Sequence, residues 1–196
     1  MMKKGFMAVA MVCMLSAASV MCVHAEEAQT ETADVEMSVP VSALEWDENL
    51  QQMFVDEGFS GTFYDIDALG MRMLVPEGME KRQPTDEEKE KDIILVFENE
   101  EKDQKIELTL GPVSDCETLD EVKVFIEENA AGVTVNPTKI NGLDTLVYGS
   151  EEADSMSVLI GAGDAGFLRV ICRPVKDAQM NKLYSYVAAS IQQIEE

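Results

Sequence analysis

Histidine is almost absent from this sequence, since its 196 residues include only His24. His24 lies in an N-terminal segment that has the features of a signal peptide and is expected to be removed. Without histidine, the remaining chain cannot form a Ser-His-Asp or Cys-His nucleophile pair, nor a metal site with imidazole ligands. The mature chain is therefore excluded from these common classes of hydrolase and metalloenzyme.

Positive charge is also scarce, with 15 Lys and Arg residues against 38 Asp and Glu, a formal net charge of −23. The predicted signal peptide carries two lysines and no acid, so its removal changes the net charge from −23 to −25. The phosphates of nucleic acids and anionic lipids would be repelled, and neither is an expected partner. Such acidity suits a solvated extracellular protein, or one that meets cations or a basic partner.

The N-terminus has the order of a signal peptide: two lysines, the apolar run 5–20, and small residues ending at Ala25. No stop-transfer flank follows the run, so no stable membrane insertion is expected after cleavage. We predict a protein that is secreted or otherwise extracytoplasmic. A lipoprotein anchored through Cys22 is the alternative, and it is disfavoured by the bulky Met21 before that cysteine.

Three segments follow from this pattern: a signal peptide at 1–25, a leader at 26–41 and one domain at 42–196. The leader is acidic and has no hydrophobic period, which is typical of a flexible segment. The 171 residues that remain after cleavage suffice for a single domain with a hydrophobic core.

Only two cysteines, Cys116 and Cys172, remain after the signal peptide. In an exported chain they can form a disulfide. It would close the loop between Cys116 and Cys172 and stabilise the fold by about 4 kcal/mol in the loop-entropy model. The alternative is two separate small residues of the core. A reactive Cys116 is disfavoured because Asp115 and Glu117 flank it and oppose a thiolate.

Hydrophobic patterns and turn signals predict three helices and eight strands. Capping boxes begin helices over 43–56 and 119–129, and apolar residues at helical spacing predict a last helix over 180–194. Short apolar or alternating runs predict the strands. They are 62–66, 71–75, 93–97, 105–110, 134–140, 143–148, 156–160 and 167–172.

Tight connections between these strands predict a mainly antiparallel sheet, with Asn141-Gly142 as the strongest hairpin signal. The strands 93–97 and 167–172 are apolar at nearly every position and need cover on both faces. We therefore predict an α+β sandwich in which helices cover both faces of one central sheet. In the alternating strand 105–110, Ile106 and Leu108 should point inward and Glu107 outward.

The strand followed by Pro-Glu-Gly at 71–79 and the closing Ala189-Ser190-Ile191 resemble the PsbP-like sandwich. Small exported bacterial proteins of the DcrB type are similar. The resemblance covers about 61–194, although Met79 stands where such proteins often have an aromatic residue. It implies a binding or accessory protein without a shared catalytic constellation.

Three patterns carry possible ligand chemistry. Asp65 and Asp67 lie two residues apart at a strand end and are a candidate weak Ca²⁺ site, as is the acidic segment 86–92. Met71, Met73 and Met79 have a spacing seen in exported Cu(I) sites, but it also fits a core face. The segment 161–166 matches G-x-G-x-x-G, yet a strand follows it where a dinucleotide site requires a helix, so we interpret it as a hairpin loop.

These observations predict an exported, non-enzymatic binding or accessory protein with an unknown ligand or extracellular protein partner and no cofactor. Two alternatives stay open, a weak cation-binding protein and a hydrolase that uses paired carboxylates. The hydrolase requires two acids in one cleft, whereas a binding protein requires a groove or an exposed apolar patch.

Overall fold

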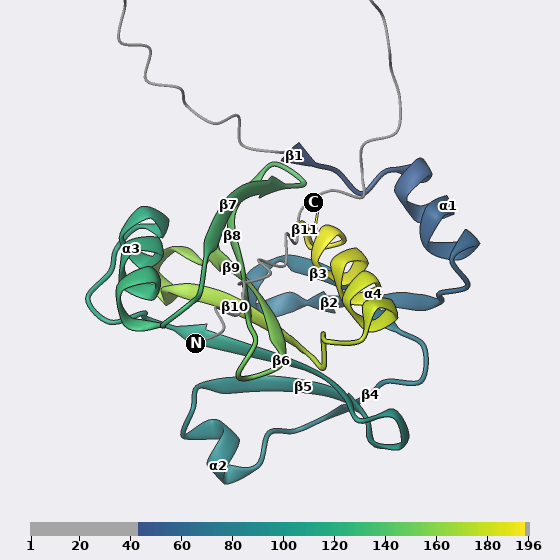
Figure 1. Ribbon diagram of the computed structural model, residues 1–196, viewed down its shortest axis with the longest axis horizontal. Coiled ribbons are helices and arrows are strands. Elements are labelled where there is room, and N and C mark those ends of the chain that lie inside the picture. Colours follow the sequence, from purple (N-terminus) through teal and green to yellow (C-terminus); the bar gives the residue numbers. More distant parts are fainter. Residues whose placement is uncertain (1–42, 195–196) are drawn as a thin grey trace, which may run out of the picture. The chain divides into compact units, whose positions relative to one another are not determined.

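The computed structural model describes residues 43–194, which fall within one compact unit spanning Val39–Glu196 (Figure 1). The predicted signal peptide, the Cys22 lipidation site and the leader lie outside the described residues. The helices are α1 (Glu48–Asp56), α2 (Asp86–Lys89), α3 (Leu119–Asn129) and α4 (Ala178–Ala189). The strands are β1 (Ala43–Leu44), β2 (Gly61–Ile66), β3 (Met71–Pro76), β4 (Glu80–Arg82), β5 (Ile93–Asn99), β6 (Gln104–Gly111), β7 (Val135–Ile140), β8 (Leu143–Ser150), β9 (Ser155–Gly161), β10 (Phe167–Arg173) and β11 (Gln192–Gln193).

The strands divide between two sheets. An eight-stranded large sheet has the order β1-β7-β8-β9-β10-β6-β5-β4, and a three-stranded small sheet has the order β11-β3-β2. Every pairing is antiparallel except the short parallel contact of β1 with β7. All eight predicted strands are present and pair mainly antiparallel as predicted, but the strands predicted at 62–66 and 71–75 lie in the separate small sheet. Hydrophobic patterning identifies strands without showing which of them pair.

The main core lies between the large sheet, β3 and α4. Leu183 contributes to a neighbouring cluster with α1, while Tyr184 and Val187 of α4 lie in the main core and are fully buried. Alternate residues of β6, β9 and β10 face them, and we call the opposite side of the large sheet its outer face. The core residues on these three strands are Ile106, Leu108, Met156, Val158, Ile160, Leu168, Val170 and Cys172.

The last helix is shorter than its hydrophobic pattern predicts. It ends at Ala189 instead of continuing to Ile194. The Ser190 hydroxyl donates to the Val187 carbonyl and accepts from the Leu74 N–H at 2.8 Å, which joins the helix end to β3. The chain then extends as β11 beside β3. The buried Ile191 preserves the helical spacing although it lies outside the helix.

The first helix begins five residues later than predicted. Residues 43–44 form β1, and Asp47 caps α1 by accepting a hydrogen bond from the Leu50 N–H at 2.8 Å. The expected capping residue, Ser42, lies outside the described residues. Trp46 therefore precedes the helix instead of lying within it, and its ring packs against the cluster formed by α1, β3 and α4.

Asn141, in the β7–β8 hairpin, joins three distant segments. Its left-handed backbone, with φ of 48°, and Gly142 at 81° form the tight turn that the Asn-Gly pair predicts. The side-chain oxygen accepts from the Trp46 N–H at 2.6 Å, and the side-chain nitrogen donates to the carbonyls of Ala189 and Ile191 at 2.9 and 2.7 Å. The start and the end of the described chain are thereby held at one hairpin.

The outer face of the large sheet carries two kinds of contact. At one end, Val122 of α3 packs in a cluster with residues of β7, β8, β9 and β10. Elsewhere, Glu107 points outward as predicted, away from the core residues Ile106 and Leu108, yet it is only 2% exposed. Its carboxylate pairs with Lys105 at 3.0 Å and with Arg173, and these long side chains cover it. Strand alternation correctly separates Glu107 from the core but cannot show that its own face is covered.

Candidate functional site

The strand β2 lies at the edge of the small sheet, with β3 on one side and no described strand on the other. The Glu77 N–H donates to the Ser60 carbonyl, and the Leu74 N–H is directed away from β2 to Ser190. Because hydrogen-bonded pairs alternate in an antiparallel ladder, the N–H and C=O groups of Gly61, Phe63 and Asp65 point outward. No other described residue bonds to these outward backbone groups.

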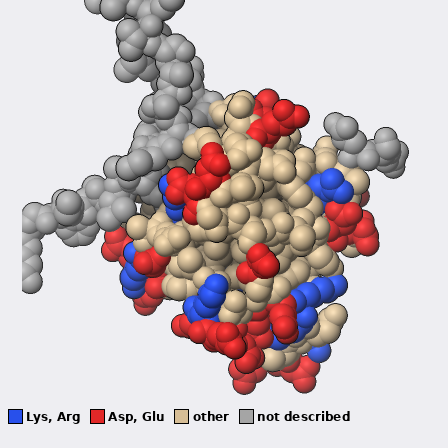
Figure 2. Space-filling model, turned by 90° about the vertical axis from the view of Figure 1, so that its right-hand side faces the viewer, with Lys and Arg blue, Asp and Glu red and all other residues tan. Residues whose placement is uncertain are grey.

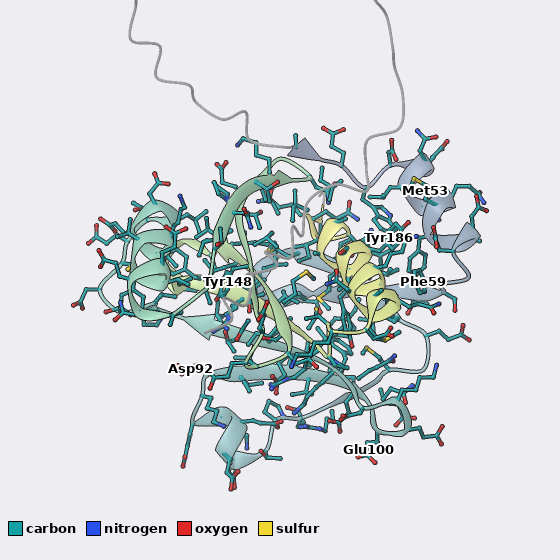
Figure 3. All side chains as sticks on the ribbon, in the orientation of Figure 1. Met53, Phe59, Asp92, Glu100, Tyr148 and Tyr186 are labelled. Atoms are coloured by element: carbon teal, nitrogen blue, oxygen red, sulfur yellow. The ribbon has the colours of Figure 1, made fainter. Side chains whose placement is uncertain are left out.

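An aromatic cluster flanks this edge. Phe63 lies edge-on to Trp46 with a centroid distance of 5.9 Å, and Trp46 contacts Phe54 at 6.1 Å. Phe54 in turn contacts Phe59 and Tyr186. Phe63 is 37% exposed, and Met53 of α1 is 39% exposed. Figure 3 shows Met53, Phe59 and Tyr186 on the side of the molecule where α1 lies. The outward edge thus lies beside an aromatic cluster with exposed apolar members.

Two shallow hollows lie at opposite ends of the β2–β3 hairpin. The first, of about 450 Å³, lies where β2 begins and β3 ends, and Glu77 is its one acidic lining residue. The second, of about 350 Å³, is lined by Leu69, Met71, Leu143 and the glycine-rich loop, and it contains no acid. Neither hollow holds the two carboxylates that a glycosidase-like reaction requires.

The charges near this edge are mostly paired. Asp65 binds the Arg72 guanidinium at 3.1 Å, and Arg72 also lies over the Phe63 ring at 5.7 Å. Asp67 begins a short 3₁₀ turn, where its backbone carbonyl accepts from the Gly70 N–H. Within residues 43–194, no three acids, cysteines or histidines are grouped in a way that can hold a metal ion. The structure therefore does not bring Asp65 and Asp67 into a larger set of ligands.

The acidic segment 86–92 is tied down by ion pairs. It contains α2, which is capped by Thr85, and the Glu88 carboxylate accepts from Arg82 at 2.6 and 2.8 Å and from Lys105 at 2.7 Å. The Arg82 hydrogen bonds, and then those from Lys105, hold the pKa of Glu88 well below its usual value. Glu88 is thus a structural anchor between α2 and the large sheet.

The two cysteines lie on opposite sides of the large sheet. Cys172 is fully buried in the main core, whereas Cys116 is half-buried against the α3 cluster, and both thiols are free. The disulfide is therefore not formed in this structure. Burial, followed by the carboxylates of Glu121 and Asp115, raises the pKa of Cys116, and burial alone raises the pKa of Cys172. Neither environment favours a reactive thiolate.

The remaining sequence patterns have structural explanations. Met71 and Met73 are buried in the main core, and Met79 packs beside it, so their spacing reflects a core face. The segment 161–166 joins β9 to β10 through a short 3₁₀ turn, which agrees with its interpretation as a hairpin loop. Gly166 has a φ of 88°, and a Cβ atom there would lie 2.5 Å from the Gly111 carbonyl oxygen. This glycine is needed by the fold.

Figure 2 views the side on which Figure 1 places α1, and it shows a broad area of uncharged side chains with acidic groups mostly at its margins. In the described part of the chain, no helix is both long enough and apolar enough to span a bilayer.

The comparisons with known proteins give a resemblance in fold. The chain resembles the solution structure of cyanobacterial PsbP (CyanoP) from Synechocystis sp. PCC 6803, with 14% identity and a TM-score of 0.44 over 68% of this chain and 92% of that one. This finding agrees with the PsbP-like resemblance of the sequence, and no function follows from it. No family model and no curated protein matched the sequence.

Sequence reasoning did not identify the edge of β2. It placed a strand there, but singled out Asp65 for its charge and overlooked Phe63. The sequence did contain one signal, an aromatic residue in a strand that has no Lys and no Pro. Natural edge strands are usually protected by such residues or by a bulge, so an edge without them is a candidate for pairing.

Proposed function

We propose that this protein is an exported, non-enzymatic binding protein that holds an extended polypeptide segment against β2. The observation that supports the proposal is the outward row of backbone groups on Gly61, Phe63 and Asp65, which no described residue engages. A peptide that adds a strand to this edge would extend the small sheet, a recognised mode of peptide binding.

The binding free energy in this proposal comes first from the main chain. The three outward residues offer three N–H and three C=O groups, and each bond formed contributes about 0.5–1.5 kcal/mol net. Apolar side chains of the added strand would lie beside Phe63 and Trp46, where the exposed Phe63 ring loses contact with water. The chain's net charge of −23 favours a neutral or basic segment over an acidic one.

The proposal includes an extracytoplasmic location, with a signal peptide cleaved after Ala25 and no nucleic-acid partner. The N-terminal charge pattern and the acidity of the whole chain support it. It also includes helical cover on both faces of the large sheet. The α3 cluster, which lies on the face opposite α4, supports that layer order.

The experiment compares two substitutions at one outward residue. Phe63→Pro removes the outward N–H and the ring, whereas Phe63→Ala removes the ring alone, and neither alters a ladder bond to β3. The probe is the peptide acetyl-Lys-Val-Thr-Val-Lys-Val-amide, whose ends carry no charge. The matched control is the same peptide with alternate residues N-methylated, because it cannot form the backbone hydrogen bonds of an added strand.

With the wild-type protein, the unmodified peptide should shift the NMR amide signals of β2 and leave those of β4 unchanged. Phe63→Ala should weaken binding about threefold to tenfold through lost apolar contact, and Phe63→Pro should weaken it further. The proposal fails if the N-methylated peptide binds equally well, or if the two variants bind alike.

A further inference from the structure

Arg169, in the middle of β10, lies on the outer face of the large sheet, because its neighbours Leu168 and Val170 are in the main core. The strands on one side of β10 are β9 and β8, which place Ser157 and Tyr148 opposite each other in their own register. These two side chains support Arg169. The site lies on the outer face of the large sheet, whereas β2 belongs to the small sheet, whose strand β3 packs with the core face.

The Arg169 guanidinium is held in a fixed orientation. Its Nε and Nη2 atoms donate to the Ser157 hydroxyl oxygen, both at 3.2 Å, and its central carbon lies 5.4 Å from the centre of the Tyr148 ring. Ser157 is 2% exposed and Tyr148 is 8% exposed, so the support is itself packed. Figure 3 shows Tyr148 between the sheet and α3. Arg169 is half-buried, so part of the residue remains accessible to solvent.

The support uses only part of the hydrogen-bonding capacity of Arg169. A guanidinium has five N–H groups in a planar fork. Ser157 accepts from one on Nε and one on Nη2, and no described residue accepts from the other N–H groups, which point from Nη1 and Nη2. Two parallel donors remain at the end of the fork, the arrangement that binds a carboxylate with two bonds.

Arg169 also lacks a counter-charge. The sequence contains four arginines, and the other three pair with acids: Arg72 with Asp65, Arg82 with Glu88 and Glu98, and Arg173 with Glu107. No carboxylate among residues 43–194 pairs with Arg169. Its direct strand partners are Thr109 and Leu159, which are uncharged. Arg169 is thus the one arginine of the four that has no acid of residues 43–194 as an ion-pair partner.

We propose that Arg169 is a binding site for a ligand that presents a single carboxylate. A carboxylate matches the open fork and supplies the missing counter-charge. A phosphate carries more negative charge and would be repelled more strongly by a chain with a net charge of −23. The carboxylate can belong to a small organic acid or to a polypeptide, and both present the same planar group.

The test uses the side-chain NMR signals of the four arginines in ¹⁵N-labelled protein. The probes are acetate, the peptide acetyl-Ala-Asp-Ala-amide and inorganic phosphate, each added at constant ionic strength. Arg72, Arg82 and Arg173 are internal controls because acids already occupy them. We expect acetate or the peptide to shift the Arg169 Nε and Nη signals with saturation, and phosphate to shift them less. Acetate acting alone would identify a small acid, and the peptide binding more tightly would identify a polypeptide.

Two variants distinguish a built site from nonspecific attraction. Arg169→Lys keeps the positive charge but loses the fork, and should weaken carboxylate binding about tenfold. Ser157→Ala removes the support and should weaken binding while Arg169 keeps its charge. Equal shifts of all four arginines, an unsaturable shift, or unchanged binding by Arg169→Lys would each overturn the proposal. These outcomes are independent of any peptide bound at β2, since Phe63→Pro should leave the Arg169 signals unaffected.

Discussion

Replacing Asn141 should destabilise the protein by more than an ordinary turn substitution. Its side chain makes three hydrogen bonds, to the Trp46 N–H and to the carbonyls of Ala189 and Ile191. Each bond contributes about 1 kcal/mol net, so their loss costs about 3 kcal/mol. The residue also has a left-handed backbone with φ of 48°, which a residue with a Cβ adopts at a cost.

Two substitutions separate these effects. Asn141→Gly removes the three bonds but suits the left-handed backbone, so it should cost about 2–3 kcal/mol. Asn141→Ala removes the same bonds and adds backbone strain of about 1 kcal/mol. Asp103→Gly is the matched control, because Asp103 has a φ of 52° and an exposed side chain that makes no hydrogen bond to a described residue. This control should change the free energy of unfolding little.

Urea denaturation followed by Trp46 fluorescence measures these differences. Trp46 is the only tryptophan, and its backbone N–H is one of the lost partners, so the native signal should also change. The reasoning is refuted if Asn141→Gly unfolds within about 0.5 kcal/mol of the wild type, the range of ordinary surface substitutions. It is also refuted if Asp103→Gly costs as much.

Three further predictions concern the core and the ion pairs. Because the folded-state pKa of Glu88 is lowered, the stabilisation by this carboxylate is complete above the ordinary value of 4.5 and is lost as the pH falls toward the lowered pKa. Urea titrations should show that Glu88→Gln is less stable than the wild type at pH 7, and that acidification lowers the stability of this variant less than that of the wild type. Glu107→Ala should cost about 2–4 kcal/mol by chemical denaturation, because it leaves Arg173 and Lys105 without their buried partner, and Glu107→Met should cost less. Val187→Asp should abolish cooperative thermal unfolding, whereas Ser185→Asp on the exposed side of α4 should not; a Val187→Asp protein that melts like the wild type would mean that the core is misplaced.

Local structure could be predicted well from the sequence because its signals are local. The Asn141-Gly142 turn and the apolar run 93–97 each specify their own backbone. The end of α4 could not be predicted in this way, because Ser190 and Ile191 continue the helical pattern. The chain leaves the helix there because β3 offers a hydrogen bond to Ser190 and a pairing partner to β11. The hydrophobic periodicity of the sequence does not show tertiary contacts of this kind.

The candidate sites were even harder to predict from the sequence, because they depend on how the strands are arranged in the sheets. Charge drew attention to Asp65, but its carboxylate is occupied by Arg72. The features that matter at β2 are its position at the edge of a sheet and the direction of its backbone groups. Likewise, Arg169 is distinctive because no acid of residues 43–194 pairs with it, and a sequence rich in acids gives no sign of that.

The position of β10 in the large sheet determines when this chain can finish folding. It lies between β9 and β6, although β6 is separated from it by more than fifty residues of sequence. Until β10 is available, β6 and β9 are two unpaired edges, and the short pairing of β1 with β7 is the one strand pairing that joins the described strands before α3 to those between α3 and β10. Closure of the sheet is thus a late, long-range event, and such contacts fold slowly. Until that closure, the free edges of β6 and β9 are the surfaces through which the chain would pair with other chains and aggregate.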